Sequence, residues 1–223
     1  MDNDLSNKIQ AIKRWLGTGS INIFGLPMSG KDTVGVKLAE AIDGKFLSSG
    51  LIIRSMEALE NKDLTGSGRM LDTDTFYEWV LPFFNKPELE NYPLVLSSIG
   101  RWSGEENRVI EKAKKTKHEI KAAVVLNISE AAVTKRWEQV PILRDREGRN
   151  DDASPEVFQT RLMEFREKTL PVILHYRQLG LLVDVKADMD RDSVFKELIN
   201  RLYDFSQRKI MESRNLRPEE RFF

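Results

Sequence analysis

A glycine-rich segment at residues 25–33, Gly-Leu-Pro-Met-Ser-Gly-Lys-Asp-Thr, constrains the fold of this chain more than any other feature. A short apolar run, Ile21–Phe24, precedes it, and a stretch of helical period follows, with Val34, Leu38 and Ile42 on one face. This order of strand, turn and helix is the context of a phosphate-binding loop. The glycines let successive backbone N–H groups curl towards phosphate oxygens, and the helix adds the positive end of its dipole.

The phosphate-loop motif Gly-x4-Gly-Lys is completed by Gly25, Gly30 and Lys31, and Lys31 adds a full positive charge where the outer phosphates would lie. The next residue is Asp32, where the motif has serine or threonine, and Thr33 comes one place late. The segment therefore predicts a nucleotide site that carries one unusual carboxylate.

The composition narrows the class of protein further. The 223 residues suffice for one α/β domain with inserts, and 35 basic residues balance 35 acidic ones, so no overall field favours nucleic acid or a membrane surface. The absence of cysteine excludes thiolate catalysis and thiolate zinc sites, and two histidines make a catalytic triad or a histidine-rich metal site unexpected. No apolar run approaches the roughly 20 residues that span a bilayer, and the acidic N-terminus lacks a signal-peptide core, so we expect a cytoplasmic protein.

Apolar runs alternate with amphipathic segments along the chain. We expect strands at 20–24, 46–48, 94–98, 122–127 and 181–185. We expect helices at 4–16, 31–42, 51–54, 72–84, 104–116, 129–138 and 190–206, and a long helix that begins after Ser154 and is kinked by Pro171. This order predicts an α/β fold, a parallel doubly wound sheet flanked by helices, with ligands at the carboxyl ends of the strands.

The pattern divides the chain into an N-terminal helical extension at 1–19, a nucleotide-binding domain at 20–208 and a loosely held charged tail at 209–223. Within the domain, a small helical insert spans about 49–90. A charged stretch at 140–153 reads as a mobile loop, and we expect it to close over the phosphates as a short lid at about 138–153.

Arginines gather around the predicted phosphate loop. Arg54 and Arg101 come just after the second and third predicted strands, at the edge where ligands bind. Five more precede, occupy or follow the charged loop: Arg136, Arg144, Arg146, Arg149 and Arg161. Guanidinium groups hold phosphate oxygens in pairs and keep their charge, and phosphoryl transfer needs two facing anion sites. The arginines therefore favour a kinase for a small phosphorylated acceptor.

Five segments in order resemble the adenylate kinase and nucleoside monophosphate kinase family of P-loop proteins over about residues 20–208. They are Gly-x-Pro-x-x-Gly-Lys-x-Thr at 25–33, Ser-Ser-Gly-Leu-Ile-Ile-Arg at 48–54, Gly-Arg at 100–101, Arg-Asn-Asp-Asp at 149–152, and Arg-Leu at 161–162 with Leu-Pro-Val-Ile at 170–173 and Tyr176. The resemblance implies a core sheet with a helical acceptor-binding insert and a lid, and the use of ATP with Mg²⁺.

The resemblance also implies roles for individual residues. ATP would be bound by Gly25, Pro27, Ser29, Gly30, Lys31, Asp32, Thr33 and Arg136, the last against the donor base. The acceptor would be bound by Ser49, Gly50, Arg54, Arg101 and Glu105. The transferring phosphoryl group would be surrounded by Lys31, Arg101, Arg149 and Arg161.

Three positions depart from the family pattern. Ser97 replaces the aspartate that orders the water shell of Mg²⁺, and we hypothesise that Asp32 takes over part of this metal role through water, since a carboxylate beside a triphosphate otherwise repels it. Glu105 replaces the glutamine that reads adenine; an ionised carboxylate only accepts hydrogen bonds and suits the N1–H and amino edge of guanine better. Val140 replaces a lid arginine, for which Arg144 or Arg146 is the available substitute.

The sequence thus favours an enzyme of nucleotide biosynthesis: a transferase that moves the γ-phosphoryl group of ATP reversibly to a nucleoside monophosphate, with AMP as the first expectation. A kinase for GMP or a deoxynucleoside monophosphate is one alternative. A nucleotide-binding protein without transferase activity is another; Ser97 and Val140 favour it, and the retained cationic residues oppose it. We expect ATP and a nucleoside monophosphate as partners, no nucleic acid, no membrane, and a monomer.

Overall fold

A computed structural model describes residues 3–143 and 154–215 of the chain. Its five strands are β1 (Ser20–Gly25), β2 (Lys45–Ser48), β3 (Leu94–Ser97), β4 (Ile120–Asn127) and β5 (Leu182–Lys186). They form one parallel sheet in the order β2-β3-β1-β4-β5. The predicted α/β class and parallel sheet are confirmed, and each predicted strand is present within a few residues of its expected place.

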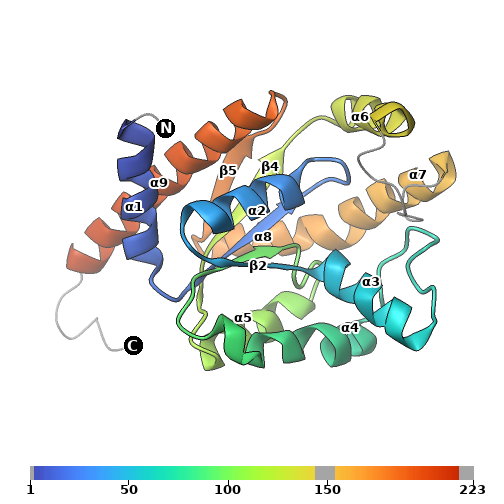
Figure 1. The fold of residues 1–223 in the computed structure, drawn as a ribbon, viewed down its shortest axis with the longest axis horizontal. Coiled ribbons are helices and arrows are strands. Elements are labelled where there is room, and N and C mark those ends of the chain that lie inside the picture. Colours follow the sequence, from blue (N-terminus) through green and yellow to red (C-terminus); the bar gives the residue numbers. More distant parts are fainter. Residues whose placement is uncertain (1–2, 144–153, 216–223) are drawn as a thin grey trace.

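Helices cover both faces of the sheet (Figure 1). On one face, α2 (Lys31–Ala41) and α9 (Arg191–Asn215) lie against the strands, and α1 (Asn3–Leu16) packs on α9. On the other face, α5 (Glu105–Lys115) and α8 (Leu170–Gln178) cover β4 and β5. No helix in the described parts is long and apolar enough to cross a bilayer.

A helical block connects β2 to β3 along one edge of the sheet. It contains α3 (Ser49–Glu60) and α4 (Thr73–Val80), followed by 3₁₀ turns at Leu81–Asn85 and Pro87–Leu89. The Ser48 hydroxyl caps α3 by accepting from the Leu51 N–H, and the Asp72 carboxylate caps α4 by accepting from the Thr75 N–H. These caps satisfy N–H groups that the first helical turn leaves without partners.

Two irregularities differ from the expected helices. The long helix after Ser154 consists of α7 (Pro155–Glu164), a π turn at Phe165–Thr169 and α8, so the distortion precedes Pro171 instead of being centred on it. The tail that was expected to be loose from Lys209 is helical up to Asn215, where α9 ends, and residues 216–223 lie outside the described residues. In the predicted lid, α6 (Glu130–Leu143) runs through Pro141; the rest of the lid, with Arg149, lies outside the described residues.

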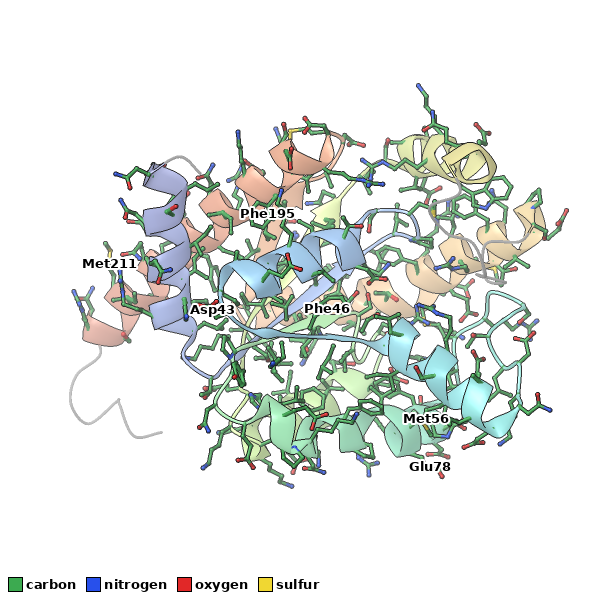
Figure 2. All side chains as sticks on the ribbon, in the orientation of Figure 1. Asp43, Phe46, Met56, Glu78, Phe195 and Met211 are labelled. Carbon is green, nitrogen blue, oxygen red and sulfur yellow. The ribbon has the colours of Figure 1, made fainter. Side chains whose placement is uncertain are left out.

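Side chains fill both layers between the sheet and its helices (Figure 2). All six residues of β1 are buried, as expected for a central parallel strand that has helices on both faces. On the α2 face, the ring of Phe46 lies so close to Gly35 that an added Cβ there would come within 2.6 Å of Cε2. Gly35 therefore lets α2 approach β2 closely.

One polar side chain inside β1 shapes the ligand-binding edge of the sheet. Asn22 is fully buried; its Nδ2 donates to the Ile99 carbonyl at 2.7 Å, and its Oδ1 accepts from the Ile99 N–H at 3.3 Å. Ile99 leads directly into Gly100 and Arg101. The central strand thus fixes the segment that presents Arg101.

We expect Asn22→Ala to destabilise the fold by about 3 kcal/mol, because it leaves both backbone groups of buried Ile99 without partners. Urea unfolding measures the change. Asn85→Ala is the matched control: Asn85 is exposed and its Oδ1 accepts from Lys112 Nζ at the surface, so its replacement should change stability by no more than about 0.5 kcal/mol. An Asn22→Ala variant as stable as the control would contradict the role given to this side chain.

Candidate active site

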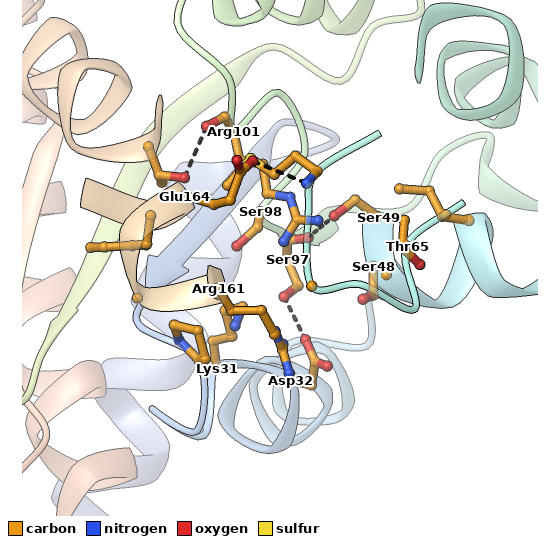
Figure 3. Close-up of a pocket in the computed structure, with 18 of the residues that line it drawn as sticks. Lys31, Asp32, Ser48, Ser49, Thr65, Ser97, Ser98, Arg101, Arg161 and Glu164 are labelled. Carbon is orange, nitrogen blue, oxygen red and sulfur yellow. Dashed lines mark hydrogen bonds between the residues drawn. The ribbon is translucent and has the colours of Figure 1, made fainter. Parts of the chain in front are cut away.

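A cleft opens at the carboxyl ends of β1, β2 and β3, where ligands of parallel sheets bind (Figure 3). Its walls come from the glycine-rich loop, the start of α3, the loop before α4, the segment after β3, and α7 with the π turn. Among its lining residues are Gly25, Pro27, Lys31, Asp32, Ser49, Gly50, Arg54, Arg101 and Arg161, all predicted from the sequence.

The glycine-rich loop has the backbone geometry that the motif requires. Gly30 has a φ of 87° and forms the N-cap of α2, and Met28 also has a positive φ, 65°. A Cβ at Gly25 would come within 2.7 Å of the Ser29 hydroxyl oxygen. Side chains at 25 or 30 would therefore strain the loop or displace its neighbours, which explains both glycines.

Arg136 fixes the outer side of this loop. Its Nη1 donates to the carbonyls of Met28 and Ser29 at 3.3 and 3.2 Å, and its Nη2 donates to the carbonyls of Ala187 and Met189 at 2.9 and 3.3 Å. The guanidinium thus ties the loop to the connection between β5 and α9. A planar group held by its edges offers its flat face to a stacked ring.

Cationic side chains from four different segments meet in the cleft. Lys31 begins α2, Arg54 belongs to α3, Arg101 follows β3 and Arg161 comes from α7. Gly50 permits the position of Arg54, since a Cβ there would lie 3.2 Å from Arg54 Nη1. The sequence placed these four around the phosphate loop, and the structure brings them together.

A fifth cationic side chain of the cleft, that of Arg69, was not predicted from the sequence. Arg69 is exposed and lines the cleft from the loop between α3 and α4. Its only signal in the sequence is a basic residue after Gly66-Ser67-Gly68. Within the described residues, the carboxylates that line the cleft are those of Asp32 and Glu164, so the cleft is strongly cationic.

Two buried carboxylates hold the loop that carries Arg69. Glu57 of α3 accepts from the N–H groups of Leu64 and Thr65, both at 2.8 Å, and from the Thr65 hydroxyl. Glu164 of α7 accepts from the Met70 N–H at 3.0 Å and from Lys168 Nζ at 2.5 Å. The loop is therefore fastened to α3 at one end and to α7 at the other.

The π turn fastens the segment after β3 to the same helix. The Thr169 hydroxyl donates to the Arg101 carbonyl at 2.9 Å, and the Ser103 N–H donates to the Lys168 carbonyl at 3.2 Å. Lys168 Nζ also lies 3.7 Å from the centre of the Trp102 ring. One irregular helix thus supports two walls of the cleft, the loop between α3 and α4 and the segment after β3, and π turns are frequent at functional sites.

Asp32 and Ser97 meet at the floor of the cleft. Ser97 ends β3, Asp32 lies in the first turn of α2, and the Ser97 hydroxyl donates to Asp32 Oδ1 at 2.5 Å (Figure 3). The two residues that depart from the expected metal-binding pattern are therefore direct hydrogen-bond partners.

Glu105 does not line the cleft. It is only 2% exposed, and its carboxylate accepts from the Trp102 N–H at 3.1 Å and from the Thr73 hydroxyl at 3.3 Å. Burial raises the pKa of Glu105 to about 7, against the opposing effects of these hydrogen bonds and of Arg101. The carboxyl group is placed to hold the start of α4 against the start of α5.

Other predicted site residues also lie outside the cleft lining: Ser29, Gly30, Thr33 and Arg136. Ser29 is buried within the glycine-rich loop, and Thr33 is exposed on α2. Arg149, with Arg144 and Arg146, belongs to the segment outside the described residues.

Comparison with known proteins supports a kinase. No family model matches the chain. An adenylate kinase of Prochlorococcus marinus (strain MIT 9515) is 27% identical over 184 residues, covering 78% of this chain and 93% of the relative. Adenylate kinase 2 of Schistosoma mansoni is 26% identical over 227 residues, covering 83% and 91%. A solved gluconokinase from Sinorhizobium meliloti 1021 superposes with a TM-score of 0.58 at 20% identity, covering 87% and 97%, and shares the fold.

The parallel sheet, the glycine-rich loop with Lys31 and the cationic cleft are features of a P-loop kinase, and the adenylate kinase matches support the same class. The adenylate kinase matches extend over most of the chain and nearly the full length of the relatives. The chain is therefore similar to the adenylate kinases over most of its length, in agreement with the sequence motifs, at 25–28% identity.

Glu105→Gln tests the state of the buried carboxyl group. Its folded pKa of about 7 exceeds the ordinary 4.5, so the folded state retains a proton that the unfolded state loses between these values. Wild-type stability should therefore fall as pH rises from about 4.5 to about 7. Relative to wild type, Glu105→Gln should gain about 3 kcal/mol between pH 4.5 and pH 8, measured by urea unfolding. An equal difference at both pH values would contradict this.

Glu164→Ala tests the fastening of the loop between α3 and α4 to α7. Removal of the carboxylate leaves the Met70 N–H without its acceptor, so exchange of this amide should accelerate at least about tenfold, a local loss of roughly 1.4 kcal/mol. Hydrogen exchange read by NMR measures it. Glu167→Ala, an exposed carboxylate on the same π turn, is the control and should leave this amide unchanged.

Proposed function

We propose that the chain transfers the γ-phosphoryl group of ATP to a nucleoside monophosphate, with AMP as the acceptor. The observation that carries this proposal is the placing of Lys31, Arg54, Arg101 and Arg161 around one cleft at the carboxyl edge of the sheet. A transferase for two phosphorylated substrates needs two anion sites that face each other, and this arrangement supplies both.

The donor phosphates would lie on the glycine-rich loop, where backbone N–H groups, the end of α2 and Lys31 converge. Arg136 would lie against the donor base, consistent with its edge-bound guanidinium. Arg54 and Arg101 would hold the acceptor phosphate in pairs of hydrogen bonds. Arg161, between the two sides, would stabilise the charge that develops on the transferring group.

Mg²⁺ fits the oxygen donors of the site. Asp32 and Ser97 place a carboxylate and a hydroxyl at the cleft floor, and Mg²⁺ is commonly held by one or two carboxylates together with substrate phosphates. When bound, the ion would neutralise charge on the β- and γ-phosphates. The catalysis proposed for the side chains is positional and electrostatic, with no covalent intermediate.

The acceptor base would be recognised by the loop between α3 and α4, where Thr65, Gly68 and Met70 line the cleft. Glu105 is turned towards Trp102 and Thr73, so its position gives no support to guanine over adenine. AMP accords with the adenylate kinases that the chain resembles.

A coupled assay with ATP, Mg²⁺ and a panel of nucleoside monophosphates tests the proposal. We expect turnover of AMP above all others, and Arg101→Ala should lower kcat/KM at least about 100-fold, since about 3 kcal/mol of charge-assisted contact is lost. Arg54→Ala should chiefly raise the KM for the acceptor. Arg201→Ala, on the exposed side of α9, is the matched control. ATP binding without turnover of any monophosphate would instead indicate a nucleotide-binding protein without transferase activity.

A further inference from the structure

The Ser97 hydroxyl and the Asp32 carboxylate at the cleft floor occupy unusual sequence positions for a P-loop protein. In P-loop NTPases, a serine or threonine hydroxyl directly after the loop lysine and an aspartate elsewhere in the site hold Mg²⁺ together. In this chain, the residue after Lys31 is Asp32, and the partner at the end of β3 is Ser97. Relative to this general P-loop arrangement, both chemical groups are present with their positions exchanged, and Thr33, the threonine of the Gly-Lys-x-Thr pattern, is retained.

The geometry supports treating these residues as one pair. Ser97 stands in register with Ile23 of β1 and Ser48 of β2, at the carboxyl edge of the sheet, and is 1% exposed. Its hydroxyl donates to Asp32 Oδ1 at 2.5 Å, and both residues line the cleft beside Lys31. The two oxygen groups are therefore in contact at the place where the phosphates would lie.

We propose that Asp32 supplies the negatively charged oxygen towards Mg²⁺·ATP and that Ser97 positions it, so the pair is an exchanged form of the usual one. This inference rests on the proposed function. A carboxylate next to the loop lysine would repel a metal-free triphosphate, whereas a bound divalent cation converts that repulsion into attraction.

The rest of the cleft offers no competing arrangement. Among the residues that the structure describes, no group of three or more histidine, aspartate or glutamate side chains could hold a metal. Glu164, the other carboxylate of the lining, is engaged by the Met70 N–H and Lys168. Asp32 lies at the cleft floor beside Lys31, where it would face a phosphate-bound cation.

Ser97 acts as a positioning residue. Its hydroxyl fixes the orientation of Asp32, and its backbone carbonyl accepts from the Ser49 hydroxyl at 3.4 Å. The strand end is thus connected to α2 on one side and α3 on the other. Loss of the Ser97 hydroxyl should reduce the Mg²⁺ dependence of ATP binding less than loss of the Asp32 carboxylate.

The experiment measures binding of a non-hydrolysable ATP analogue by calorimetry, once with Mg²⁺ and once with EDTA. Wild type should bind at least about tenfold more tightly with Mg²⁺, which corresponds to about 1.4 kcal/mol. In Asp32→Ser and Asp32→Asn, this ratio should fall below about twofold, while the affinity in EDTA stays equal or rises because a repulsive charge is removed. Ser97→Ala should show an intermediate ratio.

The double variant Asp32→Ser/Ser97→Asp restores the usual distribution and should regain the tenfold ratio. Glu40→Ser removes an exposed carboxylate from α2 and should behave as wild type. The inference is overturned by a tenfold ratio in Asp32→Ser or Asp32→Asn, by its absence in wild type, or by a folded double variant without recovery. Wild type that binds the analogue in neither buffer would instead refute the proposed function.

Discussion

The π turn at Phe165–Thr169 is the constraint on which the cleft depends. In a regular α-helix, residues at a spacing of four are rotated by about 40° around the axis. The wider π turn changes this rotation, and Arg161, Glu164, Phe165 and Thr169 all line the cleft. From this helix, Glu164 fastens the loop between α3 and α4, and Thr169 fastens the Arg101 segment. Two walls of the cleft are therefore held by one irregular helix.

Much of the fold could be predicted from the sequence because a buried parallel strand is a continuous apolar run. Ala122–Leu126 is such a run and belongs to β4, and Ile21–Phe24 of β1 is apolar except for Asn22. The end of α9 was missed for the opposite reason: beyond Lys209 the helix is mostly exposed, so it lacks the apolar spacing that marks an amphipathic helix. The π turn was not predicted because proline is the usual sign of a helix distortion, and the kink was therefore expected at Pro171. Pro171 instead lies in the first turn of α8, a position that tolerates proline, and the distortion lies before it.

The site could be predicted where a motif fixes a residue next to a strand end, as for Lys31, Arg54 and Arg101. It could not be predicted where a group acts across the fold. Glu164 and Met70 lie far apart in the chain, and only the packing of the loop on α7 brings them together. Glu105 is the opposite case: it was predicted to lie in the site and does not line the cleft. Its position in the motif does not determine the direction in which its side chain points. Its burial against Trp102 and Thr73 depends on the packing of α4 against the start of α5, which the local sequence does not predict.

The charges of the cleft also explain why so few carboxylates are tolerated there. Lys31, Arg54, Arg69, Arg101 and Arg161 create a field that favours polyanions, and each added carboxylate would weaken it. Glu164 is compatible with this field because Lys168 and a backbone N–H engage it at the wall. Asp32 lies instead beside the loop lysine at the floor, where a substrate-bound cation would be opposite it. Glu164 thus has a structural role at the wall, and the role proposed for Asp32 is one towards a cation that the substrate would bring.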